Sequence, residues 1–318
     1  MYWNYTDEYV DISMPEYVPD SLKRLRHTSE KSPQLSPHEH APIQYRQKVA
    51  QQFSTAPDTS PHLTTAETKQ IQSTTGSFLY YGRAIDYSIL LALNDIASSQ
   101  AQPTIKTKQK SKRLMDYVHT YPNAYIRFYV SDMILHVDSD ATYLIAPKAR
   151  SRIAGYFHLS DHPNITKHPK LNGAILVECK TLRHVVSSSS KYEVAGIYHN
   201  SGIDIPIRQT LQALNHPQPP TPLKTYNSTA TGFFYDNIQQ KQSKAWDMRY
   251  YWLRDRQTQQ QFNIFWEKGF NSDAEYFTKH HAIKEHLTRR SRYVKERIKP
   301  IHQKLVHLFQ QNCSHQPV

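Results

Sequence analysis

The stretch that decides the fold reads HVDSDATY at residues 136–143 and directly follows the apolar run at 133–135. We interpret it as a β-strand, and because strand side chains alternate between faces, Asp138 and Asp140 are expected on the same face. Carboxylates at a strand end suit a metal-dependent phosphodiester site, since Mg2+ prefers oxygen ligands. The alternative, a strand end with two solvated aspartates, stays open here, because a pair of metals needs more carboxylates from elsewhere in the chain.

Further strands and helices are predicted around this stretch. Alternation of apolar residues predicts strands at 125–130, 133–139, 153–159, 174–182, 223–226 and 262–266. Helical spacing is found from residue 187 through Glu193, Ile197 and Asn200, again over 205–214, and in an aromatic, basic segment at 245–257. We therefore expect a mixed α/β fold, with all of these strands in one mixed sheet that helices cover.

The residues before this sheet are expected to form smaller units. Residues 1–27 predict a hairpin and a helix that Ser13 and Glu16 open as a capping box. Residues 28–62 are rich in Ser, Pro, His, Gln and Thr and are expected to be a flexible linker. Residues 63–121 predict three helices, the first with a Thr64 and Glu67 capping box, the last opened by Pro103 and rich in lysine.

Charge and cysteine content restrict the class of protein. The 318 residues contain 39 Lys plus Arg against 27 Asp plus Glu, a net charge of +12 that favours partners with phosphate backbones or an acidic surface, although it also fits simple solubility. The two cysteines, Cys179 and Cys313, have no metal-binding spacing, which argues against disulfide partners and zinc fingers and fits an intracellular compartment. No membrane span, signal peptide or Gly-rich phosphate loop is predicted.

Several ordered motifs carry a family resemblance over about residues 1–281. The matched stretches are VDISMPEY at 10–17, GSFLYY at 76–81, SDA at 139–141, KAWDMRY at 244–250 and AEYFTKHH at 274–281. In this order they resemble the C-terminal part of the Pol polyprotein of copia-type LTR retrotransposons. The resemblance implies the end of a reverse transcriptase at 1–27, a helical connection at 63–121 and an RNase H-like domain at 122–281. Residues 282–318 lie beyond it and are expected to be a basic tail, either solvated or bound to nucleic acid.

The resemblance also implies a catalytic site. In the family, four carboxylates bind two Mg2+ ions that cleave RNA in an RNA/DNA hybrid. By position, three carboxylates fall on Asp140, Glu193 and Glu275, which are the expected catalytic and metal-binding residues, with Glu275 where the family has Asp. Tyr226 stands where the remaining Asp belongs, and Lys191 replaces an acid near Glu193. Because a tyrosine hydroxyl is mostly neutral at pH 7, we expect an intact fold with impaired chemistry.

Nucleic-acid contacts are expected from the basic connector at 147–152 and from the matched motifs. The residues are Lys148, Arg150, Arg152, Asn227, Lys244 and Arg249. The expected partner is an RNA/DNA hybrid, the cofactor Mg2+, with Mn2+ as a substitute, and, for a fragment, the remainder of a Pol polyprotein. Polymerase activity is not expected, because the chain lacks an Asp-Asp motif of that kind. Two alternatives stay open: a binding or structural remnant without chemistry, and an unrelated basic globular protein.

Overall fold

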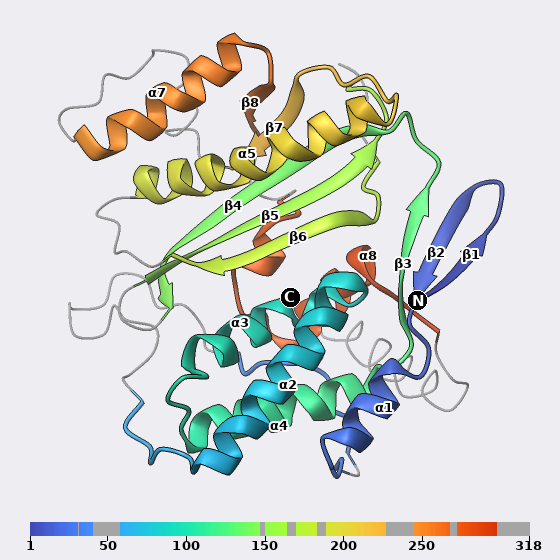
Figure 1. The fold of residues 1–318 in the computed structure, drawn as a ribbon, viewed down its shortest axis with the longest axis vertical. Coiled ribbons are helices and arrows are strands. Elements are labelled where there is room, and N and C mark those ends of the chain that lie inside the picture. The colour runs from blue at the N-terminus through green and yellow to red at the C-terminus, as the bar shows by residue number, and fades with distance from the viewer. Residues whose placement is uncertain are drawn as a thin grey trace, which may run out of the picture.

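The computed structural model confirms a mixed α/β fold with a mixed sheet between helices (Figure 1). It describes residues 1–30, 32–40, 58–146, 150–163, 170–182, 189–226, 244–267 and 272–297. This part of the chain contains two sheets, and helices pack on both faces of the larger one, so that a hydrophobic cluster lies on each face. No helix among the described residues has both the length and the apolar character needed to cross a membrane.

The larger sheet has five strands in the order β6-β5-β4-β7-β8. Its strands are β4 (Ile134–Ala146), β5 (Arg150–Ser160), β6 (Ala174–Thr181), β7 (Thr221–Thr225) and β8 (Phe262–Trp266). β5 pairs antiparallel with both β4 and β6, whereas β7 pairs parallel with β4 and β8 parallel with β7. β4 therefore lies in the middle, and Asp138 has Tyr156 beside it on β5 and Lys224 beside it on β7.

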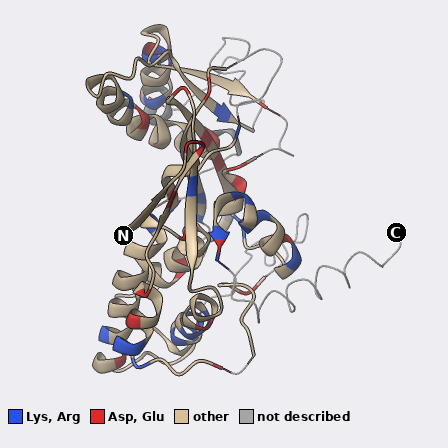
Figure 2. Ribbon diagram, turned by 90° about the vertical axis from the view of Figure 1, so that its right-hand side faces the viewer, with Lys and Arg blue, Asp and Glu red and all other residues tan. Residues whose placement is uncertain are grey.

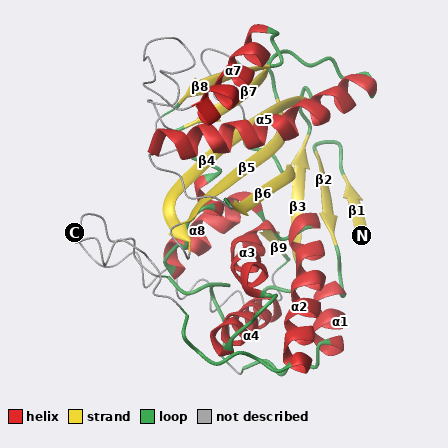
Figure 3. Ribbon diagram, turned by 60° about the vertical axis from the view of Figure 1, so that its left-hand side comes forward, coloured by secondary structure: helices red, strands yellow, loops and turns green. Residues whose placement is uncertain are grey.

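Helices cover both faces of this sheet (Figure 3). On one face, α5 (Ser189–Ala213) packs against odd-numbered β4 residues such as Leu135 and Val137, and α7 (Lys244–Thr258) packs beside α5 and β8. Asn200 of α5 donates hydrogen bonds to the Ser139 hydroxyl at 2.8 Å and the Ala154 carbonyl at 2.9 Å. Gly155 permits this approach, because a Cβ there would lie 2.5 Å from Asn200 Oδ1.

The other face of the sheet packs against a helical layer formed mostly by residues before the sheet. Its elements are α2 (Thr65–Ala84), the 3-10 turn η2 (Tyr87–Ile89), α3 (Leu90–Ser99) and α4 (Ile105–Thr120), joined by η4 (Glu275–Phe277) and α8 (Ile283–Tyr293) from the end of the chain. The three predicted helices are thus confirmed, as is the Thr64 and Glu67 capping box. Pro103 precedes the Thr104 N-cap of α4 instead of opening its first turn.

The predicted single sheet is wrong for its first strand. β3 (Ala124–Tyr129) belongs to a separate sheet with the order β1-β2-β3-β9, where β1 is Tyr2–Tyr5, β2 is Tyr9–Ser13 and β9 is Lys295–Glu296. Met133 has a left-handed backbone with φ 60°, so the chain turns between β3 and β4. Asn172 then joins the two sheets, because its side chain accepts from Tyr129 N and donates to Tyr129 O and Leu159 O.

The predicted cap of the first helix is also wrong. Ser13 lies in β2, where it pairs with Tyr2 and Tyr125, so it is not available to cap a helix. The helix α1 (Tyr17–Arg24) begins after Glu16, which has φ 65° and makes no capping side-chain hydrogen bond. The strand pairing therefore outweighs the local capping signal.

Parts of the expected linker and tail lie inside the fold. Ser36 and His38 are buried, and His38 accepts a hydrogen bond from the His281 backbone at 3.2 Å, whereas residues 41–57 lie outside the described part. In the segment expected as a basic tail, α8 packs in the helical layer and β9 pairs with β3. Both ends of the described chain thus contribute to one core.

Candidate functional site

The site lies on the face of β4 that looks toward η4 and α8. Asp138 and Asp140 share this face, as alternation predicts, and both are buried. On the neighbouring strands, Tyr156 and Lys224 pair with Asp138, and Ala154 pairs with Asp140. A buried carboxylate needs hydrogen bonds or a cation, so the partners of each aspartate define its chemistry.

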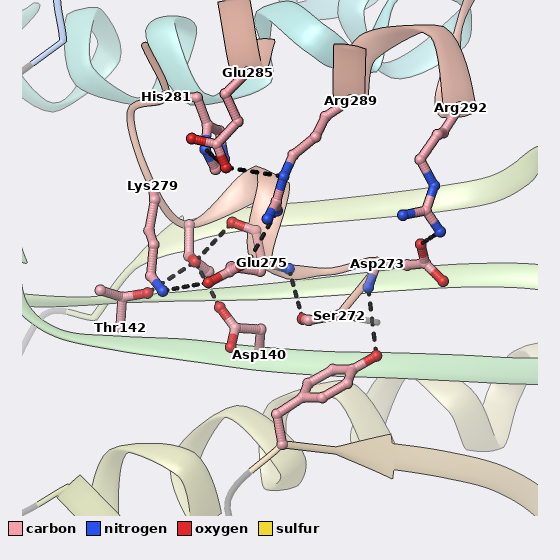
Figure 4. Close-up of polar contacts among 12 residues, drawn as sticks. Asp140, Thr142, Ser272, Asp273, Glu275, Lys279, His281, Glu285, Arg289 and Arg292 are labelled. Atoms are coloured by element: carbon pink, nitrogen blue, oxygen red, sulfur yellow. Dashed lines mark hydrogen bonds and ion pairs between the residues drawn. The ribbon is translucent and has the colours of Figure 1, made fainter. Parts of the chain in front are cut away.

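Asp140 is held by hydroxyl groups (Figure 4). Thr278 Oγ1 donates to Asp140 Oδ2 at 2.6 Å, and Thr142 Oγ1 in turn donates to Thr278 Oγ1 at 2.8 Å. Burial raises the pKa of Asp140 to about 6, and the Thr278 hydrogen bond only partly opposes that shift. Asp140 therefore takes up a proton more readily than an ordinary aspartate.

Glu193 lies in electrostatic contact with Asp140, although α5 covers the opposite face of the sheet. Glu193 is 5% exposed, and its Oε2 has no hydrogen-bond partner among the described residues. Burial and the negative charge of Asp140 raise the pKa of Glu193 well above its ordinary value. Two predicted site residues thus form one pair that disfavours double ionisation.

Glu275, at the start of η4, has both carboxylate oxygens in ion pairs. Lys279 Nζ lies 2.5 Å from Oε1, and Arg289 Nη1 lies 2.9 Å from Oε2. Burial opposes the charge of Glu275, but these two cations outweigh it and lower its pKa. Glu275 is near enough to raise the pKa of Asp140, so the third predicted carboxylate belongs to the same cluster.

Tyr226 follows β7 and contacts Asp138 instead of Asp140. Its hydroxyl donates to Asp138 Oδ1 at 3.0 Å and accepts from the Asp273 backbone N–H at 3.4 Å. Burial, together with the negative charges of Asp138 and Asp273, raises the pKa of the phenol far above its ordinary value. The side chain at this position is therefore a neutral hydrogen-bond donor.

A second charged cluster, which the sequence motifs did not indicate, surrounds Asp138. Lys224 Nζ lies 2.6 Å from Asp138 Oδ1, 3.3 Å from Glu267 Oε2 and 4.0 Å from Asp273 Oδ2. Arg292 of α8 binds the other Asp273 oxygen at 2.7 Å. A signal for Lys224 was present, because it precedes Tyr226 by two residues in a predicted strand and so shares its face. No comparable pattern indicated Glu267 or Asp273.

The described residues do not fit a two-metal set in this arrangement. Within this part of the chain, no group of three or more His, Cys, Asp or Glu side chains is placed to hold a metal ion. Both Glu275 oxygens already bind protein cations, and Tyr226 supplies no carboxylate. Asp140 and Glu193, with its unpartnered Oε2, are the groups best suited to Mg2+.

The residues predicted to contact nucleic acid lie in different surroundings. The prediction that Arg152 contacts nucleic acid is wrong. Arg152 is 2% exposed and its guanidinium pairs with Asp95 of α3, so the side chain faces the core. Arg150 is partly exposed at the start of β5, and the Arg249 guanidinium lies 5.4 Å from the Tyr198 ring centre. Lys244 begins α7, while Lys148 and Asn227 lie outside the described residues. Figure 2 shows Lys and Arg on helices of both layers.

No protein-family model matches the sequence, and no curated protein matches it either. The chain is similar to solved RNase H structures. An N-terminal RNase H domain from Mycobacterium tuberculosis, fused to maltose-binding protein, is 6% identical with a TM-score of 0.31, and the alignment covers 50% of this chain and 96% of that one. RNase H1 from Halobacterium salinarum is 9% identical with a TM-score of 0.30, over 49% and 98%. LC11-RNase H1 in complex with RNA/DNA hybrid is 7% identical with a TM-score of 0.30, over 48% and 98%.

Proposed function

We propose that this chain derives from the C-terminal part of a copia-type retrotransposon Pol polyprotein and binds RNA/DNA hybrid through an RNase H-like domain whose cleavage chemistry is impaired. The proposed impairment rests on Tyr226. Its hydroxyl donates a hydrogen bond to Asp138 and adds no negative charge to the cluster of Asp140, Glu193 and Glu275. The ordered sequence motifs support the origin of the chain. Its location is intracellular in this proposal.

The charges of the Asp140 cluster support the same conclusion. Two-metal hydrolysis needs several ionised carboxylates that are open to the metals. Here burial and mutual repulsion favour protons on Asp140 and Glu193, while Glu275 is bound by Lys279 and Arg289. Mg2+, or Mn2+ in its place, would bind at Asp140 and Glu193 and would supply Lewis-acid stabilisation of a phosphodiester oxygen. The site holds fewer available anions than the chemistry requires.

The binding part of the proposal rests on the net charge of +12. A protein that neutralises phosphates with Lys and Arg releases counterions, so log affinity should fall linearly with log salt concentration. Arg150 and Arg249 are the described candidates for these contacts. The alternative, a structural remnant without nucleic-acid binding, predicts no such salt-dependent affinity.

The experiment titrates a labelled RNA/DNA hybrid with the full chain over a range of salt and follows hybrid cleavage in the same samples with Mg2+. We expect salt-dependent binding whose slope falls by roughly one to two for a double Arg150→Ala, Arg249→Ala variant. A double Lys23→Ala, Lys284→Ala variant removes two exposed cations elsewhere and is the matched control. Absence of binding at low salt would contradict the proposal.

The impaired cleavage is tested by comparing hybrid cleavage by four proteins: wild type, Tyr226→Asp, Asp140→Asn, and Tyr226→Asp combined with Asp140→Asn. We expect Tyr226→Asp to gain Mg2+-dependent cleavage that the added Asp140→Asn removes, with the largest gain at low Mg2+. Wild-type cleavage equal to that of Tyr226→Asp, and abolished by Asp140→Asn alone, would show that Tyr226 does not impair the site.

A further inference from the structure

The cluster around Lys224 connects segments that are far apart in the sequence. Asp138 comes from β4, Glu267 follows β8, and Asp273 precedes η4, while Lys224 reaches them from β7. Its ammonium is the common partner, with carboxylate oxygens at 2.6, 3.3 and 4.0 Å. The ammonium thus adds a charged link between segments that the β4–β7 and β7–β8 pairings and the Glu267 N–H to Thr225 carbonyl hydrogen bond already bring together.

The surroundings of the ammonium resemble a cation site rather than a surface ion pair. The Asp138, Asp273 and Lys224 side chains are 3%, 9% and 18% exposed, so water screens these charges poorly. Burial opposes the charge of Lys224, yet Asp138, Asp273 and Glu267 raise its pKa above the ordinary value. A positive charge is therefore fixed at this point at neutral pH.

A buried histidine provides a second, independent indication of a ligand position. His158 of β5 is 4% exposed, and its Nδ1 has no hydrogen-bond partner among the described residues. This nitrogen lies 3.9 Å from Asp138 Oδ2, on the opposite carboxylate oxygen from Lys224. The Nδ1 atom of His158 is therefore placed to act as a nitrogen donor beside the Asp138 carboxylate.

We propose that Lys224 is the resident cation of this cluster, filling the role of a structural metal ion, and that a neutral residue at position 224 opens a site for one divalent cation. The ligands would be the carboxylates of Asp138, Glu267 and Asp273, with His158 as a nitrogen donor. Divalent cations need oxygen ligands at roughly 2.0–2.6 Å. In the wild type these carboxylates surround an ammonium, and no group of three or more His, Cys, Asp or Glu side chains in the described part of the chain is placed to hold a metal ion.

The probe is Mn2+, because it accepts both oxygen and nitrogen ligands and its free concentration can be followed by electron paramagnetic resonance. The full chain is titrated as wild type, Lys224→Met, Lys224→Arg and Lys284→Met, the last removing an exposed lysine as a control. We expect Lys224→Met to bind one Mn2+ at least about tenfold more tightly than the other three. Equal Mn2+ binding by wild type and a folded Lys224→Met would overturn the proposal.

Two double variants locate the bound ion. Lys224→Met with Asp138→Asn should lose the new Mn2+ site, whereas Lys224→Met with Asp140→Asn should keep it. Binding that follows Asp140 instead of Asp138 would place the ion in the neighbouring cluster and contradict the proposal. Because none of these measurements involves nucleic acid, failure here leaves the proposed hybrid binding intact, and the reverse also holds.

Thermal unfolding covers the case in which Lys224→Met folds poorly. We expect its Tm to fall in the presence of a chelator and to recover with Mn2+, while the Tm of wild type responds to neither. A Lys224→Met protein that is unfolded and stays unfolded with Mn2+ would show that the carboxylates do not form a cation site. Recovery by Mn2+ that disappears in the Asp138→Asn double variant would support it.

Discussion

Asp138 and Asp140 lie two residues apart on one face of β4, yet their surroundings differ in kind. Asp138 has the Lys224 ammonium at 2.6 Å and the Tyr226 hydroxyl at 3.0 Å. Asp140 has the neutral Thr278 hydroxyl as its partner, and the nearby carboxylates Glu193 and Glu275 repel its charge. The difference teaches that two aspartates on one face of a strand can have closest partners of different charge, an ammonium for Asp138 and a neutral hydroxyl for Asp140.

The largest effect is expected from Asp138→Asn. The amide keeps the shape and an acceptor for Tyr226 but removes the charge that faces Lys224, so a buried ammonium loses its closest partner. Breaking a buried pair at one side typically costs about 3–5 kcal/mol; since Glu267 and Asp273 remain, we expect about 3 kcal/mol. Urea denaturation at pH 7 measures it, and unchanged stability would mean that Lys224 does not depend on Asp138.

Asp140→Asn should act in the opposite direction. Burial raises the pKa of Asp140 to about 6 in the folded protein, above the value of about 4 for an unfolded chain. The stability that the protonated form contributes is complete below pH ~4 and is lost as the pH rises through ~6. Because Asn resembles the protonated form, the variant should match wild type at pH 4 and exceed it by about 1–3 kcal/mol at pH 7.5.

The measurement for Asp140→Asn is urea denaturation of both proteins at the two pH values. Asp140→Ala is the control, because it removes the charge and also the acceptor of the Thr278 hydroxyl. An Asp140→Asn variant that is less stable than wild type at pH 7.5 would remove the contrast with Asp138.

The smallest effect is expected from Tyr226→Phe. The ring stays in place, but the hydrogen bond to Asp138 is lost, which should cost about 1.5 kcal/mol, the lower end for a charged acceptor. Since the phenol pKa is raised far above its ordinary value, the cost should be the same at pH 6 and pH 9. Tyr5→Phe, at a 67% exposed position on β1, is the control and should change stability by less than about 0.5 kcal/mol. A pH-dependent cost would indicate that Tyr226 ionises.

The sequence predicts those parts of the molecule that depend on local patterns. Alternation placed Asp138 and Asp140 on one face, and helical spacing identified the helices that flank the sheet. It could not show that β3 leaves the main sheet, because its partners β2 and β9 lie near opposite ends of the described chain. Ser13 shows the same limit, since its capping pattern was local and its strand pairing was not.

Charged partners were the hardest part of the site to predict. Arg152 sits in a basic connector, but its partner Asp95 is on a helix 57 residues earlier, and burial there turned an expected surface contact into a core ion pair. In the same way, Arg289 and Arg292 of the expected basic tail bind Glu275 and Asp273. A run of like charges in a sequence does not show which of its members already have a partner inside the fold.

The smaller sheet has a consequence for the order of events during synthesis. Arg127 of β3 donates a hydrogen bond to Asp11 of β2, 116 residues earlier in the chain. The backbone N–H of Asn123, just before β3, donates to Glu296, 173 residues later. At a translation rate of roughly 5–20 residues per second, β2 waits on the order of ten seconds for its partner strand. Throughout that interval the β2 edge of the hairpin has no strand partner, and the exposed rings of Trp3 and Tyr5 lie on the adjacent strand β1, so the nascent chain can associate with chaperones or with other chains.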